Sequence, residues 1–433
     1  MNKKHTVVAS SVLAMSLVLG ACGGGGNNAT DGNTGGANGG NAGGEQKTVT
    51  LFQFKTEIVE GLNELKVEFE KEYPNIKLDV QTVGGGADYD AALKTKFASG
   101  DAPDIFSNNG YAKLDLWEER LEDLSDQPWV GDLVPLAAEA ITKDDKVYGL
   151  PLNLEGFGYI YNKDIFEQVG IESPPMTYSE LEAAAKKIQE AGITPFANAY
   201  QEWWLLGSQG ISNAFANQDD TDAFIAGLND GSETIAGNEH FANWAKLMEL
   251  TLEYGNRNPL TTDYNTAVSM FANGEVAMTQ NGNWAQSMID GITPDMNIGF
   301  LPMALSDDAE RSGKVTIGVP VNLVVNNESD AKEEAKIFLN WLVTSEVGQE
   351  YIVKKFMFIP PLTTIESTPE DMGALATSLQ EYIDRGDIFA HNAGKYPDGV
   401  AQEFGSAIQE FLAGRVDVQA WSENMQAAWD KLK

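Results

Sequence analysis

Residues 48–80 read TVTLFQFKTEIVEGLNELKVEFEKEYPNIKLDV, and they contain the clearest pattern of strand and helix in the chain. Its opening residues are rich in β-branched and aromatic side chains, which predicts a strand over 48–54. Apolar residues then recur at helical spacing over 58–73, and a Pro-Asn pair ends that helix. Apolar and polar residues alternate over 76–80, as in a half-buried strand. Together these elements predict a βαβ unit with parallel strands and a right-handed crossover.

The same alternation of strands and helices continues along the chain. Further strands are predicted at 105–106, 157–161, 276–279, 297–301 and 320–326. Further helices are predicted at 88–99, 177–191, 238–254, 264–273, 330–342, 344–355 and 401–433. This order predicts an α/β fold whose parallel sheets are covered by helices on both faces. Ligands of such sheets bind beyond the carboxyl ends of the strands.

Residues 1–21 are predicted to be an export signal. Lys3 and Lys4 precede an apolar run over 6–19, and small residues stand directly before Cys22. That run is shorter than the roughly 18 residues that a membrane-spanning helix needs. The sequence Leu-Gly-Ala-Cys resembles the lipobox of bacterial lipoproteins, which implies a diacylglyceryl group on the Cys22 sulfur. An ordinary signal peptide with an incidental cysteine is the alternative.

Residues 22–46 are predicted to form a flexible linker that begins with the lipidated cysteine. After Cys22 the segment is rich in Gly and Asn and holds no apolar side chain larger than alanine, so it cannot bury enough surface to fold. The chain has no second cysteine and therefore no intramolecular disulfide. A long polar linker behind a lipid anchor suits the extracellular face of a Gram-positive cell membrane, with the protein held there by the anchor alone.

The chain has a large excess of acidic over basic residues. It has 64 Asp and Glu residues against 29 Lys and Arg residues, a net charge of −35. This field argues against nucleic acid and anionic lipid as partners and favours neutral or cationic ligands. CxxC, HExxH and Walker A patterns are absent, and the acidic run 219–222 lacks the spacing of a calcium loop, so no metal or cofactor is predicted.

Six segments, DAPDIF (101–106), VYGLPLNLEGFGYIYNKD (147–164), PPMTYSEL (174–181), FANGEVAMTQNGNW (271–284), IGFLP (298–302) and FLNWLVTSEVG (338–348), occur in this order. Taken together they resemble the extracellular solute-binding proteins of ABC sugar importers, the family typified by maltose-binding protein. The resemblance implies a two-lobed α/β fold with a central ligand cleft and three hinge crossings. It also implies closure of the lobes on the ligand and delivery of that ligand to a membrane permease.

The resemblance also implies where the chain passes between the lobes. Mapped residue by residue, the crossings fall near 154–156, 298–300 and 343–345. The predicted N-terminal lobe is 47–153 with 302–343, and the predicted C-terminal lobe is 157–297 with 345–433. Two domains also agree with the length, because roughly 390 residues exceed what one hydrophobic core supports.

A sugar ring has apolar faces, which aromatic side chains cover, and polar edges, which carboxylates and amides bind. Trp284 follows the strand 276–279 in a short loop, where the family places a ring-stacking tryptophan. Trp203 and Trp204 cannot easily enter one core together, so one is expected to line the cleft, with Trp204 favoured. Helical patterns instead predict packing roles for Trp117, Trp244, Trp341, Trp421 and Trp429.

Polar ligand contacts are predicted in both lobes. Asn108 and Asn109 leave the strand at 105–106 and match the family's ligand-facing loop. Glu155 lies at the first crossing, where a ligand contact and a hinge-stabilising role stay equally open. Asn322 follows Gly-Val-Pro-Val and is expected to face the cleft.

Two further groups of polar residues are candidates for ligand contacts. Three polar residues follow the first strand at its ligand-binding end, where a solvated loop is the alternative: Gln53, Lys55 and Glu57. Tyr396 and Asp398 lie in the irregular polar stretch 390–399, which is expected to arch over the side of the C-terminal lobe. His391 in the same stretch is predicted to be a surface residue.

These features predict a monomeric, non-enzymatic protein that binds a carbohydrate, specifically an oligosaccharide. Asn108 and Asn109 stand where maltose-binding protein has a tryptophan and charged residues, which argues against a copy of the maltodextrin site. A binder of polyamines or peptides is the first alternative, because the acidic chain suits cationic ligands. A surface glycosidase is the second alternative, and it would need two carboxylates about 5 to 9.5 Å apart.

Overall fold

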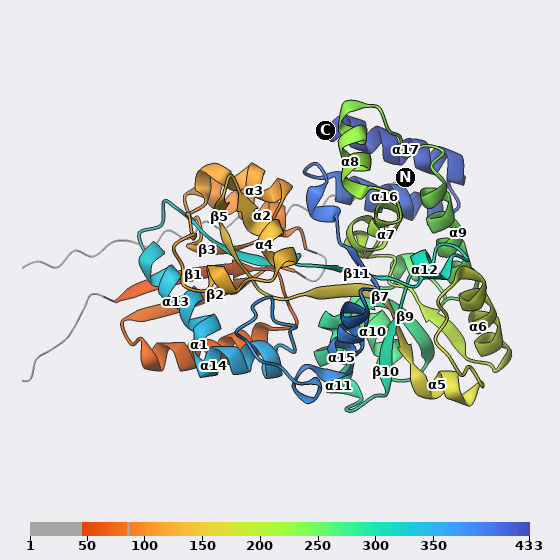
Figure 1. Cartoon of the computed structure of the whole chain (residues 1–433), viewed down its shortest axis with the longest axis horizontal. Helices are drawn as coiled ribbons and strands as arrows, with labels where there is room; N and C mark the ends of the chain where they lie inside the picture. The colour runs from red at the N-terminus through yellow and green to blue at the C-terminus, as the bar shows by residue number, and fades with distance from the viewer. Residues whose placement is uncertain (1–45, 85–86) are drawn as a thin grey trace, which may run out of the picture. The chain divides into compact units, whose positions relative to one another are not determined.

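The computed structural model describes residues 46–84 and 87–433. Residues Gly44–Lys433 form one compact unit that contains two separate large β-sheets with helices around them (Figure 1). The predicted signal peptide, Cys22 and nearly all of the predicted linker lie outside the described residues. Within the described part, every helix is too short or too polar to cross a membrane.

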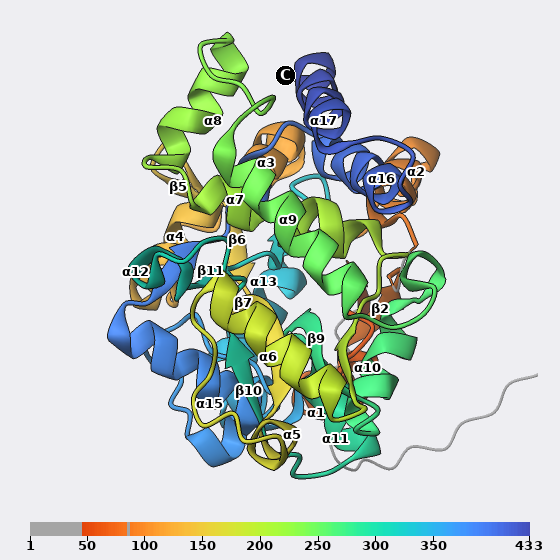
Figure 2. The same ribbon diagram turned by 90° about the vertical axis from the view of Figure 1, so that its right-hand side faces the viewer.

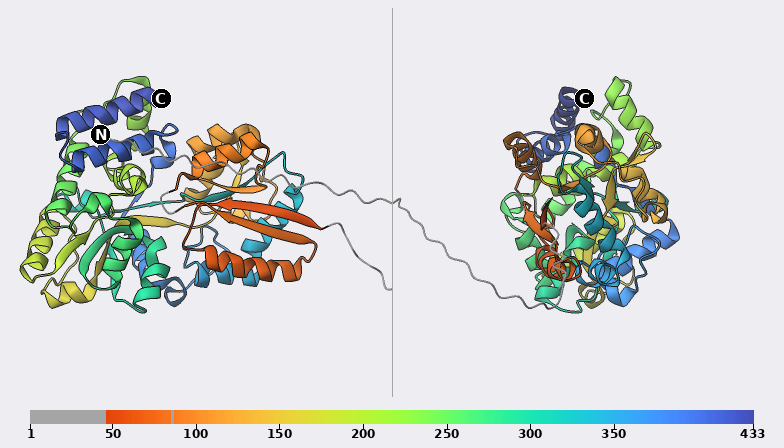
Figure 3. Two further views of the ribbon diagram at one scale, coloured as in Figure 1. Left: turned by 180° about the vertical axis from the view of Figure 1, so that it is seen from behind. Right: turned by 90° about the vertical axis from the view of Figure 1, so that its left-hand side faces the viewer.

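The first sheet is built on the predicted βαβ unit. Strands β1 (Lys47–Gln53) and β2 (Ile76–Thr82) are parallel, and helix α1 (Val59–Glu72) connects them. Helix α1 buries Leu62, Leu65 and Phe69, the residues at helical spacing. In Figure 3 this red helix lies along the red strands. The prediction for residues 48–80 is therefore confirmed.

Three more strands complete the first sheet in the order β2-β1-β3-β12-β6. Strand β3 (Ile105–Asn108) runs parallel to β1. Strand β12 (Asn322–Val325) runs antiparallel to β3 and to the short strand β6 (Gly149–Pro151). The loops that follow β1 and β3 therefore leave the same edge of the sheet, as parallel strands require.

The second sheet is mostly antiparallel, so the prediction of parallel sheets is wrong there. Its order is β13-β11-β7-β9-β8, and β10 also pairs with β7. The bounds are β7 (Glu155–Asn162), β8 (Thr194–Ala197), β9 (Val276–Gly282), β10 (Ile298–Leu301), β11 (Val315–Gly318) and β13 (Ile388–Ala390). Strand β7 is antiparallel to β9, β10 and β11. Hydrophobic periodicity reports burial but carries no information on strand direction, which explains the error.

The links between the two sheets differ from the predicted crossings. Residues 152–154 join β6 to β7. Residues 319–321 join β11 to β12, so the second link follows β10 and β11 instead of falling at 298–300. Residues 302–318 accordingly lie with the second sheet and not in the lobe predicted for them. A short apolar strand fits either sheet, so the local sequence does not decide between them.

The third link also lies later in the chain than predicted. Helices α13 (Lys332–Thr344) and α14 (Glu346–Glu350) are consecutive, and the turn that follows α14 contacts α1 beside the first sheet. Leu362 still bridges to Leu133, and α15 (Pro369–Arg385) packs on β10 of the second sheet. The chain therefore passes to the second sheet between 362 and 369, beyond the predicted 343–345.

Of the remaining helices in the described chain, six lie in ranges that the sequence predicted and seven, most of them short, were not predicted. Near the first sheet they are α2 (Tyr89–Ser99), α3 (Ala112–Trp117) and α4 (Pro135–Ile141). On the side of the second sheet they are α5 (Lys163–Gln168), α6 (Tyr178–Glu190), α7 (Ser212–Ala216), α8 (Thr221–Asp230), α9 (Glu239–Glu253), α10 (Tyr264–Ala272), α11 (Gln286–Ile292), α12 (Ala309–Ser312), α16 (Val400–Leu412) and α17 (Val418–Leu432) (Figure 2).

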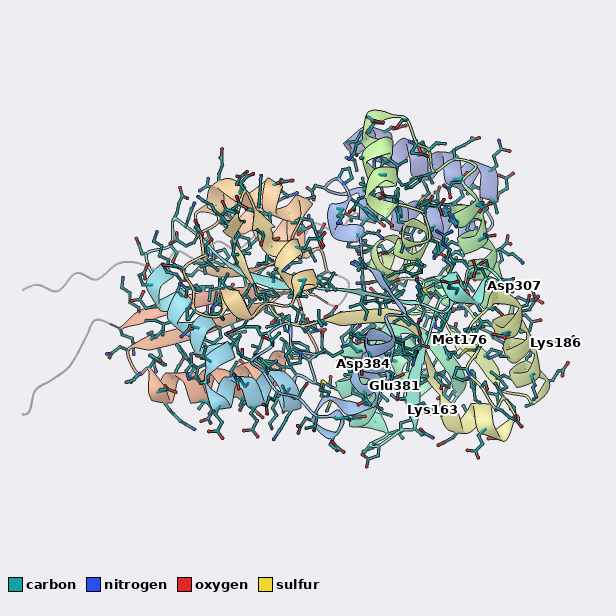
Figure 4. The ribbon with its side chains drawn as sticks, viewed as in Figure 1. Lys163, Met176, Lys186, Asp307, Glu381 and Asp384 are labelled. Atoms are coloured by element: carbon teal, nitrogen blue, oxygen red, sulfur yellow. The ribbon has the colours of Figure 1, made fainter. Side chains whose placement is uncertain are left out.

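Helix α6 shows how the sequence produces these covering helices. Thr177 and Glu180 form a capping box at its start, which satisfies main-chain N–H groups that have no partner inside the helix. The helix buries Leu181 and Ile188 and leaves Lys186 exposed at the outer surface (Figure 4). An apolar stripe of this kind is what docks an amphipathic helix on a sheet.

The five tryptophans predicted to pack inside the protein are all buried. Trp117 is 9 % exposed, and Trp244, Trp341, Trp421 and Trp429 are 3 % exposed or less. Trp244 and Trp421 stack with their ring centroids 5.6 Å apart. These side chains and the buried Trp129, which is 2 % exposed, belong to the hydrophobic cores, which leaves Trp203, Trp204 and Trp284 as the tryptophans available for a site.

Gly158 in the middle of β7 tests the packing of the second sheet. A Cβ atom there would lie 2.4 Å from the main-chain oxygen of Leu301 in β10. We expect Gly158→Ala to lower the free energy of unfolding by about 1–3 kcal/mol, measured by urea denaturation, because two backbones must separate. Gly291→Ala in α11 is the matched control, since nothing lies within 4 Å of its added Cβ. Equal stability of the two variants would contradict this packing.

Candidate functional site

The loop that leaves β1 is buried and ordered by its own side chains. Gln53 is 3 % exposed and Lys55 is 4 % exposed. The Gln53 side-chain oxygen accepts a hydrogen bond from the main-chain N–H of Lys55, and its Nε2 donates to Thr82 at the end of β2 at 2.6 Å. The alternative of a solvated loop is therefore wrong for these two residues.

Lys55 is the centre of a buried ion triad with Glu57 and Glu155. Its Nζ lies 2.5 Å from Glu57 Oε1 and 2.6 Å from Glu155 Oε1. Burial alone would lower the pKa of Lys55, but the charges of Glu155 and Glu57 raise it above its ordinary value. Asn153 donates to the same Glu155 oxygen at 3.0 Å. The lysine therefore stays protonated and joins the loop after β1 to the first residue of β7.

Trp204, Tyr264 and Trp284 form what we call the aromatic corner. Trp284 follows β9, is 8 % exposed and stacks on Phe157 at 6.2 Å with an interplanar angle of 12°. The Trp204 ring lies 6.1 Å from Trp284 and 5.8 Å from Tyr264, tilted by 54° and 57°. A Cβ atom on Gly282 would lie 2.0 Å from the Trp284 ring, so only glycine allows this indole to fold back over the strand end.

Glu202 holds two members of this corner and was not predicted as a site residue. One carboxylate oxygen accepts a hydrogen bond from Trp204 Nε1 at 3.0 Å, and the other accepts from the Tyr264 main-chain N–H at 3.2 Å. The residue is 6 % exposed. The signal in the sequence was an acidic residue directly before two tryptophans, in a loop after a strand.

The ion triad and the aromatic corner meet at the Tyr264 side chain. Burial raises the pKa of Tyr264, and the charges of Glu57, Glu155 and Glu202 raise it further. Its hydroxyl has no hydrogen-bond partner among the described residues. The aromatic corner therefore holds ring faces that can cover C–H groups, and the negative charges of Glu57, Glu155 and Glu202 act on its Tyr264 side chain.

Trp203 is placed differently from its neighbour. Its side chain is partly exposed, and its main chain lies against α16, where a Cβ atom on Gly405 would be 2.7 Å from the Trp203 oxygen. The structure brings Trp204, and not Trp203, into the aromatic corner. That Trp204 lines a ligand cleft stays a prediction.

The three candidate asparagines support the main chain where β3 meets the second link. Asn108 accepts a hydrogen bond from the N–H of Gly110 at 2.7 Å, and Asn109 donates to the Pro320 oxygen at 2.7 Å. Asn322 donates to the Asn108 oxygen at 3.1 Å, while its own side-chain oxygen is buried without a partner. These contacts fix the position of residues 319–321 relative to the end of β3.

The stretch 390–399 is tied to helices beside the first sheet. Asp398 pairs with Lys94 of α2 at 2.9 Å and with Lys113 of α3 at 2.5 Å. Burial would raise the pKa of Asp398, but Lys113 and Lys94 lower it below its ordinary value. Lys395 pairs with Glu139 of α4 at 3.1 Å. We call this segment the ionic strap, because β13 of the second sheet directly precedes it.

Tyr396 lies in the hydrophobic core on the side of the second sheet instead of at an open surface. It is 3 % exposed, and its hydroxyl donates to Asn392 at 2.6 Å. Its ring packs against Phe215 at 4.6 Å and Trp429 at 5.5 Å. A ligand could reach this side chain only if the ionic strap rearranged.

His391 is partly buried, which corrects its prediction as a surface residue. Its ring atom Nε2 is enclosed and has no hydrogen-bond partner in the part of the chain that the structure describes, while its main-chain N–H donates to the Ile317 oxygen of β11 at 2.7 Å. Burial lowers the pKa of His391 to about 4, and the hydrogen bond to the main chain of Ser208 opposes this only in part. The imidazole is therefore neutral at pH 7.

We expect stability to fall as the pH drops from about 6.5 to about 4, because the unfolded chain takes up a proton on His391 before the folded one does. A full pKa shift of this size corresponds to roughly 3 kcal/mol in the free energy of unfolding, and the partial exposure of His391 makes the expected effect smaller. Urea denaturation of His391→Gln across this range should show a flatter pH profile. An unchanged slope would contradict burial of a neutral imidazole.

We expect Lys55→Met to lower the free energy of unfolding at pH 7 by about 3–5 kcal/mol, because two buried carboxylates lose their cation. Because the pKa of Lys55 is raised in the folded protein, its ion pairs stabilise the fold at neutral pH. This stabilisation is lost only when the pH rises above the ordinary pKa of lysine. Urea denaturation of the variant and of wild type at pH 7 measures the loss of stability caused by the substitution. Lys71→Met, which breaks an exposed pair with Glu68, is the control and should cost less than about 1 kcal/mol.

The chain is similar to known bacterial binding proteins. The model of the family described as "bacterial extracellular solute-binding protein" matches residues 55–349. Melibiose/raffinose/stachyose-binding protein MelE of Bacillus subtilis is 26 % identical over 314 residues, 69 % of this chain and 70 % of that protein. The multiple sugar-binding protein of Streptococcus mutans is 25 % identical over 319 residues, 71 % of this chain and 73 % of that protein.

Solved structures share the fold. RafE in complex with raffinose superposes with a TM-score of 0.75 at 24 % identity, covering 89 % of this chain and 99 % of that one. A chitin oligosaccharide-binding protein superposes with a TM-score of 0.77 at 22 % identity, covering 90 % of this chain and 99 % of that one. These likenesses establish the two-lobed α/β architecture.

Proposed function

Because this chain belongs to the bacterial extracellular solute-binding protein family, we propose that it captures an oligosaccharide between its two lobes and delivers it to the permease of an ABC importer. In this proposal one lobe is built on the first sheet and the other on the second. The links 152–154, 319–321 and the third link between 362 and 369 are the hinge crossings. The protein acts as a monomer and binds its ligand without chemical change.

The aromatic corner carries this proposal. Trp204 and Trp284 offer two ring faces at 54° to each other, which suits a sugar whose C–H faces point in different directions. Glu57 and Glu155 stand beside Tyr264 and accept hydrogen bonds only, so they match the donor hydroxyl groups of a sugar. The relatives named for raffinose, stachyose and other sugars support the same ligand class.

The anchoring is a separate part of the proposal. The Leu-Gly-Ala-Cys sequence supports a diacylglyceryl group on Cys22, which would hold the protein at the extracellular face of a Gram-positive cell membrane. Two acyl chains give stable attachment, since each buried CH₂ contributes about 0.8 kcal/mol. The Gly- and Asn-rich residues 23–46 would then act as the tether.

We expect titration calorimetry to find saturable binding of one sugar among raffinose, stachyose, maltotriose and chitin oligosaccharide. Trp284→Ala and Trp204→Ala should each weaken that binding at least tenfold, about 1.4 kcal/mol, because each removes one wall of the corner. Trp341→Phe is the control, since Trp341 packs against Phe69 instead of the corner. Equal loss of affinity in all three variants would contradict a site at the corner.

The same titrations separate the alternatives. Three carboxylates against one ammonium also suit a cationic ligand, so spermidine and a basic peptide belong in the panel. Binding of these but of no sugar would replace the oligosaccharide with a polyamine or peptide. Release of shorter sugars from a bound oligosaccharide would instead indicate a glycosidase.

A further inference from the structure

We propose that Glu202 is a positioning residue that fixes the angle of the Trp204 indole and thereby sets ligand affinity without touching the ligand. The inference rests on the proposed function only for its effect on affinity. The hydrogen bonds that carry it join protein groups only. It assigns a role to a residue that the sequence analysis did not single out.

Both carboxylate oxygens of Glu202 are already engaged by protein donors. Oε2 accepts from Trp204 Nε1 at 3.0 Å, and Oε1 accepts from the Tyr264 main-chain N–H at 3.2 Å. The residue is 6 % exposed, so little of its surface is left for a ligand. Glu202 therefore links the loop after β8 to the first residue of α10 and holds the indole between them.

The chemistry of this link requires a carboxylate. Among the described residues Glu202 has no ion-pair partner, so its buried charge depends on these two hydrogen bonds. Both partners are N–H donors, and a carboxylate presents an acceptor to each of them. Glutamine has the same shape but would turn an NH₂ group toward one of the two donors. A glutamine at this position must therefore give up one contact.

The contact most easily given up is the one to the indole. Tyr264 N is fixed at the start of a helix, whereas the Trp204 side chain can rotate about its own bonds. Rotation would change the 54° angle between Trp204 and Trp284, which defines the two walls of the corner. Loss of the carboxylate would thus alter the site through Trp204.

A double-mutant cycle tests this role, with titration calorimetry against the sugar that wild type binds. We expect Glu202→Gln to weaken binding about tenfold in the wild-type background. Trp204→Phe keeps an aromatic ring but has no N–H donor. In this background Glu202→Gln should weaken binding less than about threefold, because the glutamine has only the Tyr264 main-chain N–H to satisfy. A tenfold loss that persists in Trp204→Phe would mean that Glu202 contacts the ligand directly and would overturn the proposal.

Measurements without ligand keep the test independent of the proposed function. Near-ultraviolet circular dichroism of Glu202→Gln should differ from wild type, and this difference should vanish in the Trp204→Phe background. In wild type, the Trp204 indole N–H resonance, assigned by its absence in Trp204→Phe, should exchange slowly with solvent. Rapid exchange and an unchanged dichroism spectrum would overturn the positioning role even if sugar binds. If no sugar binds, a coupled spectrum still supports the role while the proposed function fails.

Discussion

The buried ion pair between Lys55 and Glu155 is the constraint on which the arrangement of the two sheets depends. Lys55 follows β1 of the first sheet, and Glu155 opens β7 of the second, with 2.6 Å between their charged atoms. The lysine ammonium also lies 5.3 Å from the ring of Phe358, which precedes the third link. A buried charge cannot lose its partner without a cost of several kcal/mol, so separation of the segments at this point is strongly disfavoured.

The ionic strap makes the opposite kind of contact between the same two halves of the chain. Asp398 is 34 % exposed, and its partners Lys94 and Lys113 are 49 % and 17 % exposed, so water reaches these pairs more easily than the buried triad, where Lys55 is 4 % exposed. Pairs of this kind contribute about 0–1 kcal/mol each, against the several kcal/mol of the buried triad. Separation of the two halves is therefore far cheaper at the strap than at Lys55. This asymmetry is what a hinge requires, since one side must hold while the other releases.

Local sequence patterns predicted the elements well and their assembly poorly, for physical reasons. The βαβ unit at 48–80 follows from periodicity that depends only on burial. The direction of β10 and β11, and their place beside β7, depend on contacts between segments distant in sequence, so the crossing predicted at 298–300 was wrong. Among site residues, Trp204 and Lys55 stood out by type and position after a strand. Glu202 did not, because its role comes from donors on two separate segments.

The charge balance of the corner limits what can occupy it. Lys55 is the cation of the site and is already paired with two carboxylates, so it has no free charge to offer an anionic ligand. Glu57, Glu155 and Glu202 place negative potential around Tyr264. A phosphorylated or uronic sugar would add a further buried negative charge without a partner, at a cost of several kcal/mol. In the proposed site a neutral polyol meets Glu57 and Glu155 with donor hydroxyl groups instead, and its C–H faces can cover the indoles of Trp204 and Trp284.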